Sequence, residues 1–123
     1  MADSKPKVPV WCAGEDWCPI TSTATLIGKK WHTPIIHRLL EHDELGFNDL
    51  KREVDGISSK VLSEALEDLE QKGMVDREIV SEKPIRVAYS LTGFGRSLEP
   101  VIMEMARWGK QHLEPADHQQ SIA

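Results

Sequence analysis

The stretch from Ser58 to Leu91 constrains the fold most, because an amphipathic helix is followed directly by two alternating segments. Ser58 is a favoured N-cap residue for this helix, and Gly73 is a favoured stop. One face of the helix gathers the apolar side chains of Val61, Leu62, Ala65, Leu66 and Leu69. Segments 74–80 and 85–91 alternate between apolar and polar residues, and SEKP between them is typical of a turn. The pattern predicts a helix followed by a β-hairpin.

Hydrophobic periodicity predicts three helices before this unit and one after it. The three earlier helices span about 19–27, 30–42 and 47–54. The predicted buried face of the second one consists of Trp31, Ile35, Ile36, Leu39 and Leu40. The last helix is long, starts after the N-cap Thr92 and should kink at Pro100. This order predicts a mainly α fold with a small β-hairpin wing, which is a winged helix-turn-helix.

At 123 residues the chain has the length of one domain. We expect the domain at 11–113, between a disordered arm at 1–10 and a disordered tail at 114–123. No apolar run approaches the roughly 20 residues that cross a bilayer, and the first residues lack the apolar core of a secretory signal. We therefore expect a cytoplasmic protein with no membrane partner. Two cysteines are too few for a disulfide scaffold and are expected to be thiols.

Several motifs together resemble the HxlR-type transcriptional regulators. They are CP at 18–19, GKKW at 28–31, GISSKVL at 56–62 and YSLTGFG at 89–95. The resemblance covers about residues 18–108 and implies a homodimeric DNA-binding regulator whose dimer contacts come from its N- and C-terminal helices. Members of the family commonly carry arginine at the position of Gly46 and often a basic residue at that of Glu67. Both departures remove positive charge from the DNA side, so they bear on affinity more than on fold.

The predicted helix after Ser58 would be the recognition helix of such a fold. The N-terminal part of a recognition helix reaches the base edges, and the outward side chains there are Ser59, Lys60, Ser63 and Glu64. Lysine can donate to guanine, serine can donate or accept, and glutamate can accept from cytosine N4. Further along, Asp68 and Glu70 are expected to face solvent. The alternative is an outer face that is merely solvated.

Cations near this helix are candidates for phosphate contacts. They lie on the predicted wing and at helix ends, and they are Lys83, Arg86, Lys51, Arg52, Lys29 and Lys30. The wing cations can also enter the minor groove, or all of these residues can be solvated bystanders. Between Gly46 and Leu91, seven basic residues stand against ten acidic ones. We therefore expect Glu64 and Glu67 to repel phosphates wherever the base contacts do not fit.

The acidic balance also supports a second hypothesis, a winged-helix adapter that binds proteins and never engages DNA. The net charge is −5, whereas nucleic-acid-binding domains are usually basic. Fold alone does not decide between the two functions. An enzyme is not expected, because the chain has no G-x-S-x-G motif and no phosphate-binding loop. No cofactor is expected either, and the sequence does not identify an effector.

Cys18 precedes Pro19 and so lies at a predicted helix N-terminus, where backbone N–H groups stabilise a thiolate. By the resemblance, the cysteine at this position senses oxidants or electrophiles in some relatives. Cys12 has no counterpart in the family pattern, and it can act as a resolving partner or have no role. The alternative is an inert, packed thiol. Zinc binding by Cys12, Cys18, His32 and His37 is not expected. The first spacing exceeds the usual roughly two to four residues, and the two histidines diverge around a helix.

The last predicted helix carries an apolar stripe made of Leu98, Ile102, Met105 and Trp108. Such a stripe is too apolar to be left in water on a small domain. We therefore expect a two-fold homodimer that uses this stripe together with the 19–27 helix. A two-fold dimer would require an inverted-repeat operator in double-stranded DNA, with half-sites about one helical turn apart.

Overall fold

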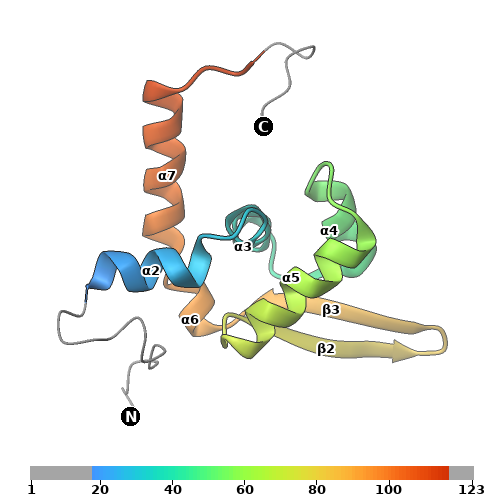
Figure 1. Cartoon of the computed structure of the whole chain (residues 1–123). Helices are drawn as coiled ribbons and strands as arrows, with labels where there is room; N and C mark the ends of the chain where they lie inside the picture. The colour runs from blue at the N-terminus through green and yellow to red at the C-terminus, as the bar shows by residue number, and fades with distance from the viewer. Residues whose placement is uncertain (1–17, 117–123) are drawn as a thin grey trace.

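A computed structural model of the chain describes residues 18–116. The elements in chain order are α2 (Pro19–Ile27), α3 (His32–Glu41), β1 (Leu45–Gly46), α4 (Phe47–Glu53), α5 (Ser59–Gln71), β2 (Val75–Glu82), β3 (Ile85–Leu91), α6 (Gly93–Arg96) and α7 (Glu99–His112). The β2–β3 hairpin extends beyond the helices, and α7 projects away from them with α2 crossing near its base (Figure 1). This is the mainly α, winged helix-turn-helix architecture that the sequence predicts.

The core lies where α3, α4 and α5 meet the inner end of the hairpin. Its fully buried large side chains are Ile35, Ile36, Leu39, Leu50, Leu62, Leu66, Leu69 and Met74. The predicted apolar faces of α3 and α5 are confirmed at these positions, while Trp31, Leu40 and Val61 at the margins are only half-buried. Burying a side chain of this size contributes on the order of 1.5–3 kcal/mol, so this cluster is the main force that holds α5 in place.

The sheet has three strands in the order β1–β3–β2. The hairpin strands pair from Val75 with Leu91 to Glu82 with Ile85, and β1 joins the other edge of β3. The turn is therefore shorter than the predicted SEKP. It consists of Lys83 and Pro84, because β2 continues to Glu82 and β3 begins at Ile85. β1 is not evident in the sequence, because a two-residue strand is too short to show alternation. By pairing with β3, β1 ties the start of α4 to the wing.

The prediction of one long C-terminal helix is wrong. Thr92 is an N-cap, and its hydroxyl accepts a hydrogen bond from the Gly95 N–H at 3.0 Å, but the helix that it starts ends at Arg96. Pro100 lies in the first turn of α7. A missing N–H is tolerated in a first turn because that donor has no partner within the helix. The proline therefore helps to begin a second helix and does not kink a continuous one.

The predicted arm at 1–10 and most of the predicted tail at 114–123 lie outside the described residues, as does Cys12. Residues 113–116 have no regular secondary structure. No helix within residues 18–116 is long and apolar enough to cross a membrane.

Candidate nucleic-acid interface

The start of α5 presents the polar side chains that the sequence singled out. Ser58 caps the helix, its hydroxyl accepting a hydrogen bond from the Val61 N–H at 3.1 Å. All four predicted base-contacting residues are exposed, and they are Ser59, Lys60, Ser63 and Glu64. Among residues 18–116, none of them forms an ion pair. Their polar groups are thus available to a ligand.

The turn between α4 and α5 sets the angle at which α5 is presented. Gly56 has a φ of 86°, a backbone conformation that L side chains rarely adopt, and Ile57 after it is buried. At the end of α4, Lys51 and Arg52 are both exposed. Arg52 forms an ion pair with Asp49 in the same helix, whereas Lys51 has no such partner in the part of the chain that is described. Lys51 is therefore the more available of the two predicted phosphate contacts.

The other predicted phosphate-contacting cations differ in whether they already interact with another side chain of the protein. Lys83 and Arg86 are exposed near the tip of the β2–β3 wing. The ammonium of Lys30 lies 4.9 Å from the centre of the Trp31 ring. Lys29 lies 3.6 Å from a carboxylate oxygen of α5. An engaged cation attracts phosphate less, so the two wing residues are stronger candidates than Lys29.

Asp68 contradicts the prediction that it faces solvent. Its Oδ2 accepts a hydrogen bond from Nε2 of His32 at 2.6 Å and forms an ion pair with Nζ of Lys72 at 2.9 Å. Lys72 also donates to the carbonyl oxygen of Leu26 at 3.2 Å. We call His32, Asp68 and Lys72 the Asp68 cluster; it joins α5 to the end of α2 and the start of α3. Glu70 is exposed, as predicted.

The charges of the Asp68 cluster follow from burial and contact. Burial alone would raise the pKa of Asp68, but His32, Lys72 and Lys29 outweigh it and lower the pKa to about 2. His32 is 2% exposed, and burial lowers its pKa more than Asp68 raises it. At neutral pH an ionised carboxylate therefore accepts a hydrogen bond from a neutral imidazole. The other ring nitrogen, Nδ1, is buried without a hydrogen-bond partner among the described residues.

The Asp68 cluster is not evident in the sequence, because His32 and Asp68 are 36 positions apart. Their contact depends on how α3 packs against α5, which periodicity does not specify. The one local signal was the spacing of Asp68 and Lys72, which are four residues apart and therefore neighbours on a helix surface.

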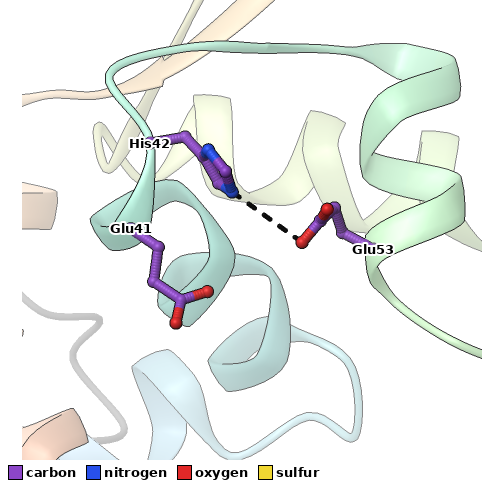
Figure 2. A group of neighbouring side chains, drawn as sticks. All are labelled: Glu41, His42 and Glu53. Atoms are coloured by element: carbon purple, nitrogen blue, oxygen red, sulfur yellow. Dashed lines mark ion pairs between the residues drawn. The ribbon is translucent and has the colours of Figure 1, made fainter.

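A second cluster of ionisable groups joins the ends of α3 and α4 (Figure 2). Side-chain atoms of Glu41, His42 and Glu53 lie within 4.8 Å of one another, and all three residues are exposed. The guanidinium of Arg38 lies 3.0 Å from Glu41 and 4.0 Å from Glu53. Because Arg38 already supplies a cation to both carboxylates, we interpret this cluster as an ion-pair network between the two helices.

The histidines weighed for zinc binding engage different partners. Nε2 of His32 bonds to Asp68, whereas Nε2 of His37 lies 3.7 Å from Glu41. The two histidine side chains diverge on α3, as the spacing of His32 and His37 in the sequence predicts.

Cys18 is the N-cap residue of α2, as predicted, and its side chain is half-buried. The backbone N–H of Thr21 contributes most to lowering the pKa of the Cys18 thiol. The Thr21 hydroxyl and the Ile20 N–H act in the same direction, and burial acts against them. The helix start therefore favours the thiolate form, which is the reactive form of a cysteine.

The predicted apolar stripe is split between the core and the surface. Ile102 is buried in the core, and Leu98 is half-buried against it. Met105 and Trp108 are 48% and 56% exposed, and they line an open groove of about 720 Å³ along α7. On α2, Ile20 is 80% exposed. The surface left for a partner is thus centred on Met105 and Trp108 and excludes Ile102.

The structure combines an exposed polar helix start with a β-hairpin wing and a helix packed behind them. This combination defines the class of winged helix-turn-helix transcriptional regulators. Residues 26–117 match a protein family described as HxlR-like helix-turn-helix. The chain therefore belongs to the HxlR-like family, and it is a transcriptional regulator and not an enzyme.

Known relatives extend over most of this chain. The HTH-type transcriptional regulator YodB of Bacillus subtilis (strain 168) is 38% identical over 105 residues, which are 85% of this chain and 93% of YodB. The structure of the redox regulator HypR in its oxidised form is similar with a TM-score of 0.73 and 35% identity, covering 80% of this chain and 100% of HypR. Reduced YodB is similar with a TM-score of 0.67 and 39% identity, covering 81% of this chain and 98% of that structure.

Proposed function

We propose that this regulator binds specific sequences of double-stranded DNA as a homodimer, with α5 as the recognition helix. The observation that carries the proposal is the exposed start of α5, where Lys60, Ser63 and Glu64 have no ion-pair partner among the described residues. The other end of the same helix is fixed by the Asp68 cluster. A helix whose C-terminal end is fixed by the protein and whose N-terminal end is exposed can present side chains to base edges in a fixed geometry.

Each exposed group has a chemical role in this proposal. Lys60 donates to guanine, while Ser63 and Glu64 discriminate between neighbouring bases. Phosphate contacts fix the register of the helix in the groove. We assign them to Lys51, Arg52, Lys83, Arg86 and Lys30, and Arg52 would have to leave its ion pair with Asp49 to take part.

Selection of binding sites from a library of random duplexes tests this function. We expect the full chain to enrich an inverted repeat with half-site centres about one helical turn apart. A Ser63→Ala, Lys60→Ala double variant should lose that enrichment. A Lys110→Ala variant, changed at an exposed position on α7, should keep it. If the wild-type chain enriches no motif, it acts as an adapter that binds proteins, and the proposal is wrong.

The homodimer is proposed to form through α2 and α7. The exposed side chains of Met105 and Trp108 line the groove on α7, and a groove this apolar is rarely left in water. Sedimentation at micromolar concentration should give a dimer, and Trp108→Asp should shift it toward the monomer. A wild-type monomer under these conditions would remove both the dimer and the inverted-repeat requirement.

Regulation through Cys18 is the third part of the proposal, and it rests on the lowered pKa of the Cys18 thiol and on the similarity to the redox regulator HypR. The rate of iodoacetamide alkylation, measured against pH in a Cys12→Ser background, should show a midpoint below the usual thiol value of about 8.5. A midpoint at or above that value would make Cys18 a structural residue.

A further inference from the structure

The tip of the wing is apolar, although it extends beyond the core. Ile85 is 73% exposed and Val80 is 52% exposed. Pro84 lies beside Ile85 and is exposed as well. Val80 is an extra residue in its strand, because Ile79 pairs with Val87 and Ser81 pairs with Arg86. We call Val80, Pro84 and Ile85 the apolar wing tip.

Cations border the apolar wing tip in the sequence. Lys83 and Arg86 flank the Pro84–Ile85 pair, and both are exposed. Within residues 18–116, neither has a carboxylate within 4.0 Å. The tip extends beyond the helices and lies far from α7, the helix proposed to form the dimer (Figure 1). It therefore combines a small exposed apolar surface with two positive charges that are in no ion pair, and with one exposed carboxylate, that of Glu82, which pairs with Ile85 across the hairpin.

This combination favours duplex DNA over a protein as the occupant. Three side chains cannot supply the roughly 800 Å² per partner that a stable protein interface buries. Minor-groove binders, in contrast, often insert single apolar side chains such as isoleucine or proline between base steps, with basic side chains nearby. The charges of Lys83 and Arg86 complement phosphates on the two edges of a minor groove.

We propose that the apolar wing tip enters the minor groove beside each half-site, with Ile85 packed against a base step that it partly unstacks. Lys83 and Arg86 contact the flanking phosphates. The wing then selects sequence by the ease with which a step deforms, and pyrimidine–purine steps deform most easily. This inference rests on the proposed DNA binding and adds to it a site at which specificity is set without hydrogen bonds to bases.

Substitutions at Ile85 separate an apolar contact from an electrostatic one, and the residue is exposed enough for the fold to tolerate them. On the duplex selected by the wild-type chain, Ile85→Ser should weaken binding by on the order of ten-fold without changing its salt dependence. Ile85→Leu should bind like the wild type. Lys83→Ala should instead lower the slope of log affinity against log salt by about one. Ile85→Lys should bind the selected duplex more weakly and random duplex more tightly.

Fluorescence of 2-aminopurine, placed in turn at each step outside the half-sites, reports unstacking directly. The wild-type chain should raise the fluorescence at one step on each side, and Ile85→Ser should abolish the rise. Unchanged binding by Ile85→Ser would show a solvated tip, and tighter binding of both duplexes by Ile85→Lys would show a purely electrostatic contact with phosphate. Either result would overturn the inference. A change in sedimentation of Ile85→Ser with DNA binding intact would also overturn it, in favour of a second copy as occupant. If the wild-type chain selects no duplex, the proposed function itself fails.

Discussion

The two ends of α5 differ in how they are held. At the C-terminal end, Asp68 accepts a hydrogen bond from His32 and forms an ion pair with Lys72, and Lys72 donates a hydrogen bond to the last turn of α2. At the N-terminal end, Lys60 and Glu64 are exposed, and neither forms an ion pair within residues 18–116. At one end of the helix, Asp68 and Lys72 are therefore held by contacts within the protein, and at the other end Lys60 and Glu64 are directed outward.

This difference shows how a single helix can serve both the scaffold and a binding surface. A binding surface requires side chains held in a fixed geometry, and the support must come from outside the surface itself. The buried faces of Leu62, Leu66 and Leu69 provide most of that support, and the Asp68 cluster adds a directional polar contact. The two ends should consequently respond differently to substitution: changes at Asp68 should alter stability, and changes at Lys60 should alter DNA binding.

The largest effect on stability is expected from Asp68→Ala. The substitution leaves the buried Nε2–H of His32 without its acceptor, which costs about 2–3 kcal/mol of the free energy of unfolding. Glu70→Ala, at an exposed position of the same helix, should change that free energy by less than about 0.5 kcal/mol. Urea denaturation of the three proteins measures both values. Equal stability of the two variants would show that the cluster does not anchor the helix.

A smaller loss of stability is expected at acidic pH. The pKa of Asp68 is lowered from 3.8 to about 2 in the folded chain. Its stabilisation is therefore complete above about pH 4 and is lost as the pH falls through 2. With allowance for partial exposure, the loss is about 1–2 kcal/mol. Asp68→Asn should abolish this step in a plot of urea midpoint against pH.

His32 adds a second pH window. Its pKa is lowered from the ordinary 6.5 by burial, so the unfolded chain binds the proton more readily than the folded chain does. Stability should accordingly fall as the pH drops below 6.5. The same titration with His32→Asn should lack this upper step, whereas His112→Asn, at an exposed histidine, should retain it.

The smallest effect is expected from two exposed carboxylates of α5, Glu64 at the open end and Glu67 about one turn further along the helix. Glu64→Gln and Glu67→Gln remove charges that repel phosphate, so random duplex should bind up to several-fold more tightly while the selected duplex changes less. Stability should stay within about 0.5 kcal/mol of the wild type. Binding titrations at several salt concentrations measure these differences. Unchanged binding of random duplex would place both carboxylates away from DNA.

Local patterns were sufficient to predict helices α2 to α5, the hairpin and the exposed start of α5. Ser58, for example, is a cap by its type and position, and the apolar spacing in α5 identifies its buried face. The break before α7 was missed because a proline in a first turn and a proline within a helix look alike in sequence. The contact between His32 and Asp68 was missed because it arises only when α3 packs on α5.

The open end of α5 is proposed to bind specific base edges, and substitution of Lys60 distinguishes a base contact there from a phosphate contact. The measurement is the dissociation constant of Lys60→Ala on selected and on random duplex, with Lys110→Ala as the matched control. We predict a loss on the order of 1–3 kcal/mol on the selected duplex, a clearly smaller loss on random duplex, and no change for Lys110→Ala. Equal losses on both duplexes would restrict Lys60 to phosphate contact, and no loss on either would show that Lys60 does not contact DNA.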